Sequence, residues 1–400
     1  MDGFRQLFGM DPAVQVRAPG RVNLIGEHTD YSLLPVLPLA MDRATRVTGA
    51  VTDDGRLQVH SRQFGGDADL AWPGLQVREP WHRYVAGVAA VLGERTAAQG
   101  ARLWIDSDLP STGGLSSSSA FTMGLLAALN HLWHLGLAPG ALVDRAIVAE
   151  RHVGVESGGM DQTVIAHAQE GAALRIDFDP PSTRPVPLPP ELHVVVAYSG
   201  AEAPKGGAVR QAYNDRVIGC RLAAAMLGAA GDPPVLGAVA DAPAGEVERL
   251  PDAASAEAVA RRAGIDVGPL VRLTAGRFNQ RAPVRVRAVA RHVLDEARRV
   301  DQAERALVAV DLDRLGQLLD QSHHSLAQDF RCSTDGLDRL CRVARETGAL
   351  GARLTGAGFG GYALAAVTSD RLDAVMRALG EAGPGPVFET RASGGLKVMG

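Results

Sequence analysis

A glycine- and serine-rich segment that leads into a helix constrains this chain more than any other feature of its sequence. Residues 109–120 read Leu-Pro-Ser-Thr-Gly-Gly-Leu-Ser-Ser-Ser-Ser-Ala, and the apolar residues that follow at helical spacing predict a helix from Leu115 to Leu135. Small residues let a backbone approach an anion closely, and a helix N-terminus offers unpaired N–H groups. The segment is therefore a candidate phosphate site, with a serine-rich helix cap as the alternative.

A phosphate bound here would receive almost no help from lysine. Lys205 and Lys397 are the only lysines of the chain, and both lie outside the segment. The sequence has no Gly-x-x-x-x-Gly-Lys-Ser/Thr motif, so this is not the common P-loop. Backbone N–H groups, serine hydroxyls, Mg²⁺ and arginine would have to supply the countercharge.

Glu150 favours a cation near this segment. A second helix is predicted from about Ala141 to Glu150, and Glu150 occupies the next position of its apolar stripe. A carboxylate that points inward is costly unless it is paired or binds a cation. The alternative is a helix end with Glu150 in water.

A second polar run lies near the N-terminus. Arg21, Asn23, Glu27, His28 and Asp30 follow one another among glycines and apolar residues. Each hydroxyl of a sugar ring is both a donor and an acceptor, and carboxylates and imidazole suit it well. The run indicates a sugar site, although each residue taken alone has an ordinary loop or core interpretation.

A third polar point is the run from Gly158 to Gln162. Two glycines bring the backbone close to a ligand, and Asp161 follows them. Phosphoryl transfer from ATP to a hydroxyl requires a group that orients or deprotonates the acceptor. Asp161 is a candidate for that role, with a simple turn aspartate as the alternative.

Length and pattern predict an α+β protein of two domains. A chain of 400 residues is long for one core, and strand and helix patterns occur in both halves. The proline-rich residues 180–190 place the boundary near residue 190. A strand from Val14 to Ala18 is expected to stop at Pro19-Gly20, and residues 231–257 are expected to form a surface insertion.

Composition points to a cytoplasmic protein. The formal net charge is −4, so no global basic field indicates nucleic acid. The three widely spaced cysteines form neither a disulfide framework nor a zinc motif. No apolar run suits a membrane span and the first residues do not resemble a secretory signal. We expect no membrane partner and a monomer.

Taken together, these segments resemble the GHMP kinases, and within that superfamily the galactokinases. Residues 20–31 are similar to the galactokinase sugar signature, residues 110–120 to the ATP-binding signature, and residues 354–361 to the third GHMP motif. Shorter similar segments lie around Trp81, around Tyr213, at residues 322–326 and at Cys332-Ser333. The resemblance spans nearly the whole chain.

The resemblance implies a role for each matching residue. Asp161 would be the catalytic base, and Arg21 its partner near the transferred phosphate. The sugar would be bound by Glu27, His28, Asp30, Gly158 and Tyr213. ATP would contact Trp81, Gly113, Gly114, Leu115, Ser116, Ser117 and Ser118, and Mg²⁺ would be held by Ser118 and Glu150.

The resemblance also implies a fold and a reaction. The fold would be a ribosomal-S5-like N-terminal domain over residues 1–190 and a ferredoxin-like C-terminal domain over residues 191–400. The reaction would transfer the γ-phosphate of ATP to the C1 hydroxyl of galactose. Ser32, Leu33 and Leu34 stand where most bacterial galactokinases have Asn-Gly-Gly or similar. Other segments resemble the eukaryotic galactokinase and N-acetylgalactosamine kinase branch, so an N-acetylgalactosamine kinase, another GHMP sugar-1-kinase and a non-catalytic sugar and ATP sensor remain alternatives.

Overall fold

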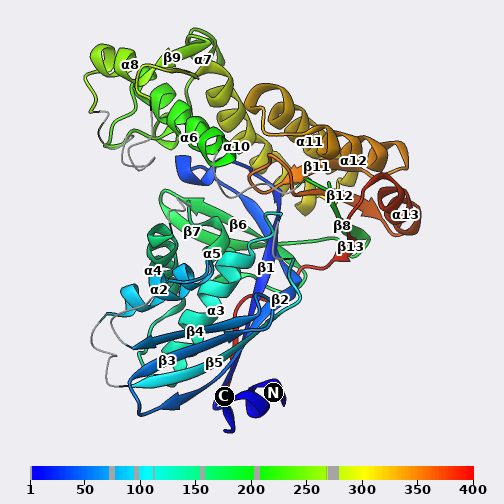
Figure 1. Cartoon of the computed structure of the whole chain (residues 1–400). Coiled ribbons are helices and arrows are strands. Elements are labelled where there is room, and N and C mark those ends of the chain that lie inside the picture. Colours follow the sequence, from blue (N-terminus) through cyan, green and yellow to red (C-terminus); the bar gives the residue numbers. More distant parts are fainter. Residues whose placement is uncertain are drawn as a thin grey trace.

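The computed structural model describes residues 2–71, 77–93, 99–110, 113–153, 158–201, 208–266, 268 and 279–400. Two α+β halves meet along the N-terminal strand and one long helix (Figure 1). Residues 111 and 112 of the predicted phosphate segment, and Lys205, lie outside the described residues. Among the described residues, no helix is long and apolar enough to cross a bilayer.

The N-terminal half is built on a six-stranded sheet in the order β14-β1-β2-β5-β3-β4. Every neighbouring pair is antiparallel except β3 and β5, which are parallel. The strands are β1 (Val14–Ile25), β2 (Leu37–Thr52), β3 (Arg56–Ser61), β4 (Gly66–Ala71), β5 (Gly100–Ser107) and β14 (Lys397–Met399). The last strand therefore returns to pair with the first, which places the two chain ends close together (Figure 1).

Helices of the N-terminal half pack beside this sheet, and a short helix lies at the N-terminus. A β-hairpin of the same half lies on the side that faces the C-terminal half. The helices are α1 (Asp2–Phe8), α2 (His82–Leu92), α3 (Ser117–Leu132), α4 (Pro139–His152) and α5 (Met160–His167). The hairpin is β6 (Ala172–Phe178) with β7 (Pro181–Pro187). The predicted helices from Leu115 and from Ala141 correspond to α3 and α4, and α3 contacts both β1 and β2.

The prediction that the first strand stops at Pro19-Gly20 is wrong. Strand β1 continues to Ile25, and its pairing with β2 shifts register between Pro19 and Arg21. Such a bulge absorbs a residue that does not fit the ladder and re-aims the side chains beside it. Glycine suits this position because a Cβ would press on the side chain of Leu109 and lie 2.9 Å from the backbone carbonyl of Leu115. The bulge lies next to Arg21, the first predicted site residue.

The C-terminal half contains an antiparallel four-stranded sheet in the order β11-β12-β8-β13. Its strands are β8 (Leu192–Tyr198), β11 (Gly351–Thr355), β12 (Tyr362–Thr368) and β13 (Val387–Thr390). The helices are α6 (Ala208–Met226), α7 (Ala244–Glu248), α8 (Ala256–Ala263), α10 (Arg287–Val308), α11 (Leu312–Ser325), α12 (Asp335–Glu346) and α13 (Leu372–Ala382). Strands β9 (Ala253–Ser255) and β10 (Pro283–Arg285) form a small separate pair.

Residues 231–257 are more than the surface insertion that their composition predicts. Leu236, Val247, Leu250 and Ala256 are buried in the apolar core of the C-terminal half. Polar residues between them remain exposed. The segment is thus anchored by a few apolar side chains, a pattern that alanine- and glycine-rich composition hides.

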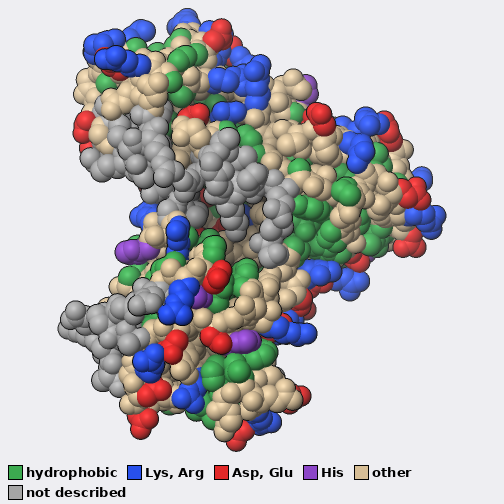
Figure 2. Space-filling model, viewed as in Figure 1, with side chains coloured by type: hydrophobic (Ala, Val, Ile, Leu, Met, Phe, Trp, Pro, Cys, Tyr) green, Lys and Arg blue, Asp and Glu red, His purple; other side chains and the backbone are tan. Residues whose placement is uncertain are grey.

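Helix α10 packs against both halves. Val289 and Val293 at its start belong to the C-terminal core, whereas Val300 and Leu307 belong to the core that includes the six-stranded sheet. The boundary near residue 190 falls between β7 and β8 and stays a prediction. On one side the molecular surface is hollowed between the two halves (Figure 2).

Candidate active site

Arg21 and Asp161, the predicted reactive pair, are in direct contact. Arg21 extends from β1, and Asp161 lies in the first turn of α5, which begins after Gly159 in a left-handed conformation (φ 98°). Arg21 Nε lies 2.7 Å from Asp161 Oδ1, and Nη2 lies 3.0 Å from Oδ2. Two parallel N–H···O bonds of this kind fix the carboxylate in one orientation.

Charge explains why Arg21 can be only 6% exposed. Burial alone would lower the pKa of Arg21, but the negative charges of Asp161, Glu27 and Asp30 outweigh it and the pKa is raised. Arg21 is therefore a permanent cation surrounded by carboxylates. A cation in this position can also meet the charge of a phosphate group.

Ser116 joins this pair to the glycine-serine segment. Ser116 precedes α3 in a left-handed conformation (φ 58°), and its hydroxyl donates to Asp161 Oδ2 at 2.5 Å. Arg21 Nη1 also donates to the carbonyl of Gly114, at 2.5 Å. A left-handed conformation in a residue other than glycine is uncommon and tends to occur at functional sites. The predicted base thus lies beside the N-terminus of α3.

The glycine-serine segment and the third GHMP motif, residues 354–361, pack backbone to backbone. A Cβ on Gly361 would collide with the carbonyl of Gly113, and one on Gly356 would lie 2.9 Å from the carbonyl of Gly114. Gly113 and Gly114 themselves have φ values of 98° and 86°. Only glycine allows this approach, which leaves the amides ahead of α3 held by the loop between β11 and β12.

Glu150 and Ser118, the predicted magnesium ligands, both lie near the hydroxyl of Tyr84. Burial raises the pKa of Tyr84, the charge of Glu150 raises it further, and a hydrogen bond with Ser118 opposes them. Glu150 is only 2% exposed. No group of three or more His, Cys, Asp or Glu that could hold a metal occurs in the part of the chain that the structure describes. A carboxylate and a hydroxyl suit Mg²⁺, which keeps several waters and binds substrate phosphates.

Trp81, the predicted adenine neighbour, lies in an aromatic group beside α3. Its ring stacks on Phe64, with centroids 5.9 Å apart, and meets Phe121 edge-on at 6.1 Å. Trp81 is buried whereas Phe64 is largely exposed. A lone phenylalanine such as Phe64 carries no sequence signal that would place it beside Trp81.

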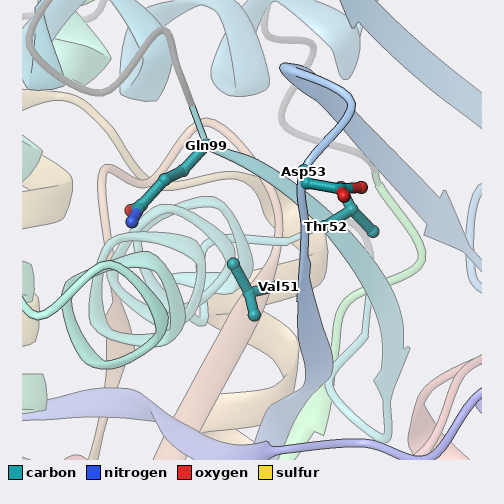
Figure 3. Close-up of a pocket in the computed structure, with 4 residues that line it drawn as sticks. All are labelled: Val51, Thr52, Asp53 and Gln99. Atoms are coloured by element: carbon teal, nitrogen blue, oxygen red, sulfur yellow. The ribbon is translucent and has the colours of Figure 1, made fainter.

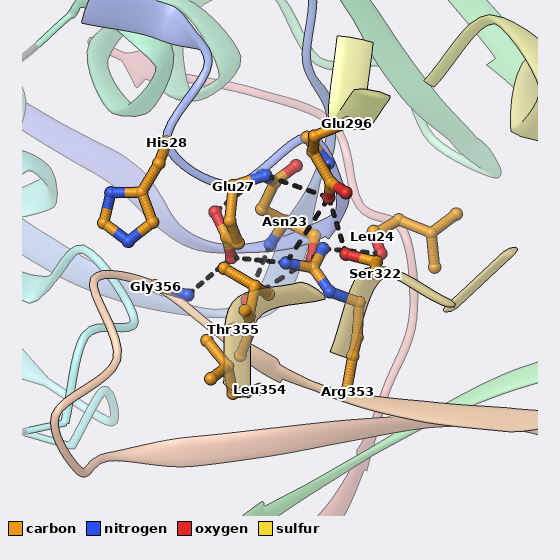
Figure 4. A network of polar contacts seen from close by, with 12 residues as sticks. Asn23, Leu24, Glu27, His28, Glu296, Ser322, Arg353, Leu354, Thr355 and Gly356 are labelled. Carbon is orange, nitrogen blue, oxygen red and sulfur yellow. Dashed lines mark hydrogen bonds and ion pairs between the residues drawn. The ribbon is translucent and has the colours of Figure 1, made fainter. Parts of the chain in front are cut away.

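Glu27, the first predicted sugar residue, is buried and already has protein partners (Figure 4). Asn23 Nδ2 donates to Oε2 at 2.8 Å, and the backbone N–H of Gly356 donates to Oε1 at 2.6 Å. Burial raises the pKa of Glu27 despite the nearby charges of Arg353 and Arg21. A carboxylate has about four lone-pair sites, so it can accept a further hydrogen bond.

His28 and Tyr213 form an aromatic wall with Phe330. His28 stacks on Phe330 with centroids 4.3 Å apart, and Tyr213 of α6 lies 5.8 Å from His28. Burial and the neighbouring His292 lower the pKa of His28 to about 3, so its ring is neutral near pH 7. Its Nε2 lies 3.2 Å from the carbonyl of Ala357, which can only accept, so Nδ1 is the acceptor of this tautomer.

Asp30 and Gly158 meet where the polar run approaches α5. A Cβ on Gly158 would collide with the carboxylate of Asp30 and lie 2.5 Å from the backbone nitrogen of Tyr31, so this contact requires glycine. Burial raises the pKa of Asp30 to about 6, and the charges of Asp161 and Glu27 add to this effect. Asp30 therefore binds a proton more readily than an ordinary aspartate does.

A separate hollow lies away from these residues. Val51, Thr52, Asp53 and Gln99 line a space of about 400 Å³ beside the turn after β2 (Figure 3). None of the predicted site residues lines it. The predicted catalytic and sugar residues instead gather where β1, α5 and the β11–β12 loop meet.

The three motifs also match known family models in the same order along the chain. The galactokinase galactose-binding signature matches residues 2–51, the GHMP kinase N-terminal domain matches residues 83–169, and the GHMP kinase C-terminal domain matches residues 303–385. Outside these three ranges, the chain still aligns with whole relatives.

Curated relatives are similar over nearly their full length. A galactokinase of Chloroflexus aurantiacus is 37% identical over 381 residues, which cover 94% of this chain and 89% of that protein. A galactokinase of Streptomyces coelicolor is 34% identical over 387 residues, which cover 95% and 91%.

Solved structures agree with these relatives. The galactokinase of Lactococcus lactis, solved with galactose, superposes with a TM-score of 0.83 and 26% identity, covering 99% of this chain and 98% of that one. The mevalonate kinase of Methanococcus jannaschii superposes with a TM-score of 0.64 at 15% identity, over 96% and 98%, and shares the fold.

Proposed function

Because the chain belongs to the galactokinase family of the GHMP kinases, we propose that it transfers the γ-phosphate of ATP to the C1 hydroxyl of galactose. The products are galactose 1-phosphate and ADP. The observation that carries the proposal is the pairing of Arg21 with Asp161 beside the N-terminus of α3. A base, a fixed cation and a helix N-terminus are the parts that transfer of a phosphoryl group requires.

In the proposed mechanism Asp161 accepts the proton of the C1 hydroxyl. The C1 oxygen forms a bond to the γ-phosphorus while the bond from that phosphorus to the β,γ-bridging oxygen breaks, and ADP leaves with the electron pair. Arg21 holds the Asp161 carboxylate in place and offsets charge on the transferred group. If the transition state is loose, the proton moves late and the base contributes less.

The sugar is proposed to lie against the 27–30 segment, α5 and α6. Glu27 and Asp30 supply carboxylate acceptors, and His28 supplies the Nδ1 acceptor of its neutral ring. Gly158 allows the backbone before α5 to lie against Asp30, and Tyr213 lies beside His28. A site built to pair a hydroxyl rejects an analogue that cannot pair, because polar groups of the site are then stranded.

Ser118 and Glu150 are proposed to hold Mg²⁺. When bound, the ion would neutralise charge on the phosphates of ATP. The helix N-terminus at Gly113 to Ser118 and the side chain of Arg21 would meet the remaining charge. Trp81 is proposed to lie beside adenine.

The cysteines and the charged residues support a proposed cellular location and set of partners. All three cysteines are free and buried, which suits a reducing cytoplasm. Both Lys or Arg and Asp or Glu side chains occur on the face seen in Figure 2, and the formal net charge is −4, which does not favour nucleic acid as a partner. We propose a cytoplasmic monomer whose partners are galactose and ATP.

Comparing turnover on several hexoses tests the proposal. With ATP and Mg²⁺, galactose should give ADP, glucose should give little, and kcat/KM for galactose should exceed that for N-acetylgalactosamine. A preference of about tenfold for N-acetylgalactosamine, ~1.4 kcal/mol in the transition state, would identify an N-acetylgalactosamine kinase instead. Absence of turnover with every sugar, together with binding of both ligands, would identify a sensor.

A further inference from the structure

The backbone that carries the predicted sugar residues is held by side chains from the C-terminal half. Pairing of β1 with β2 ends at Ile25, so the backbone polar groups of Gly26 and Glu27 need other partners. Glu296 Oε1 accepts from the N–H of Gly26 at 3.0 Å and from that of Glu27 at 3.4 Å. His292 Nε2 lies 3.2 Å from the carbonyl of Glu27. Both partners come from α10.

The segment needs external support because its conformation is costly. Gly26 has a φ of 105° and His28 a φ of 66°, so left-handed residues flank Glu27 on both sides. A residue other than glycine in this region is strained, and it keeps that conformation only where its surroundings hold it. Without Glu296 and His292, His28 would be free to relax toward a more common conformation.

Glu296 is itself fixed in place. It is completely buried, Ser322 Oγ donates to Oε1 at 2.6 Å, and Arg299 Nε lies 2.7 Å from Oε2. Burial alone would raise the pKa of Glu296, but the charges of Arg299 and Arg353 outweigh it and lower the pKa. The carboxylate is therefore a rigid charged acceptor that faces Gly26 and Glu27, the start of the sugar segment, by which we mean residues 26–30 (Figure 4).

Arg353 holds the other side of the same segment. It is completely buried on β11, and Nη1 donates to the carbonyl of Leu24 at 3.0 Å. Its Nη2 lies 3.6 Å from Glu27 Oε1 and 4.0 Å from Glu296 Oε1. Arg353 therefore contacts the backbone before Glu27, the side chain of Glu27 and the side chain of Glu296.

We propose that Glu296 is a positioning residue for galactose, which acts by fixing the backbone of Gly26 and Glu27 and so the side chains of Glu27, His28 and Asp30. The proposal rests on the proposed function. It also accounts for the sequence similarity at residues 322–326, which the reaction does not use. Ser322 of that motif binds Glu296, and Ser325 lies 3.0 Å from His292 Nδ1.

The test compares Glu296→Gln with Glu304→Gln, a matched control on the same helix. Glu304 binds Arg184 at 2.7 and 2.8 Å and Arg175 at 3.3 Å, so it also joins α10 to the N-terminal half, but through the β6–β7 hairpin. Both variants should lower the melting temperature. Only Glu296→Gln should raise the galactose KM, by about tenfold, as expected for ~1.4 kcal/mol, with the ATP KM little changed.

Three results would overturn the proposal. The first is an unchanged galactose KM in Glu296→Gln. The second is a rise of the ATP KM in Glu296→Gln equal to that of its galactose KM. The third is a galactose KM that rises as much in Glu304→Gln as in Glu296→Gln. If Glu296→Gln does not fold, His292→Leu should raise the galactose KM, and His292→Gln, which can still donate to the Glu27 carbonyl, should restore it. Equal galactose KM values in those two variants would also overturn the proposal. A wild-type protein inactive on galactose would instead refute the proposed function.

Discussion

Arg21 binds both carboxylate oxygens of Asp161, with Nε 2.7 Å from Oδ1 and Nη2 3.0 Å from Oδ2. The two residues are far apart in sequence, and the contact joins the first strand to the N-terminus of α5. Ser116 adds a third donor to the same carboxylate. Three protein donors therefore orient the carboxylate, as an efficient general base requires.

Asp161→Asn should lower kcat by ~10²–10⁴, the usual contribution of a general base, while galactose still binds. The amide cannot take the proton of the hydroxyl and also places a donor against Arg21 or Ser116. Steady-state kinetics with galactose titrations by calorimetry check this, and the melting temperature shows whether the variant is folded. Turnover close to that of the wild type would show that Asp161 is not the base.

The sequence made Arg21 and Asp161 separate candidates because each lies in a short polar motif, and the family resemblance implied their pairing. Arg21 follows Gly20 directly, Asp161 lies two residues after Gly159, and the glycine-serine segment leads into α3. What failed was local reasoning about Pro19-Gly20. A Pro-Gly pair usually marks a turn, but here the sheet continues through a bulge because Gly20 packs tightly against Leu109.

The hydrogen bonds by which Glu296 holds the backbone of Gly26 and Glu27 could not be predicted in the same way. Glu296 lies in the run Asp-Glu-Ala-Arg-Arg, which is typical of an exposed helix face. Only the packing of α10 against β1 and α11 turns that carboxylate inward toward Gly26 and Ser322. Charged residues that are buried in pairs give no signal in hydrophobic patterning, since the pattern counts each of them as polar.

Ser118→Ala should raise the KM for Mg-ATP and the Mg²⁺ concentration needed for half-maximal rate. The expected change is about fivefold to a hundredfold, as for loss of a hydrogen bond or ligand worth ~1–3 kcal/mol. Ser117→Ala is the control for Mg²⁺ dependence, because Ser117 is the neighbouring half-buried serine at the start of α3 and is a predicted ATP contact but not a proposed Mg²⁺ ligand. Equal effects of the two substitutions on Mg²⁺ dependence would contradict the role of Ser118.

Gly113→Ala should lower the melting temperature and raise the ATP KM. Gly113 has a φ of 98°, and a Cβ there would collide with the ring of Tyr362, so both backbone strain and a clash oppose the change. Gly140→Ala in α4 is the control, since a Cβ at that position has no neighbour within 4 Å. Thermal unfolding should show Gly140→Ala unchanged or slightly stabilised, by up to ~1 kcal/mol. An ATP KM unaffected by Gly113→Ala would contradict the placement of ATP at this loop.

The raised pKa of Asp30 predicts how kcat/KM for galactose depends on pH. Burial raises the pKa of Asp30 to about 6, with Asp161 and Glu27 adding to the effect. As pH falls through 6, Asp30 gains a proton and loses acceptor capacity for a sugar hydroxyl. kcat/KM for galactose should therefore decline below about pH 6 with an inflection that Asp30→Asn lacks, whereas the ATP KM should change little over the same range. Identical pH profiles of kcat/KM in the two proteins would rule out this role.

The same carboxyl group should lower the stability of the protein at neutral pH. The pKa of Asp30 is higher in the folded protein, about 6, than the ordinary value of 3.8, so the folded state binds this proton more tightly than the unfolded state does. Stability is therefore lost as pH rises from about 4 through 6, where the folded group must ionise. Asp30→Asn removes this cost, so its melting temperature should exceed that of the wild type by a few degrees at pH 8, since ~1 kcal/mol shifts the melting temperature of a domain by about 2–4 °C. The difference should shrink as pH falls toward 4 and vanish below about pH 3, where the carboxyl group is protonated in both the folded and the unfolded protein. A variant that is less stable than the wild type at pH 8, or a difference that grows on acidification, would show that Asp30 is instead stabilised as an anion.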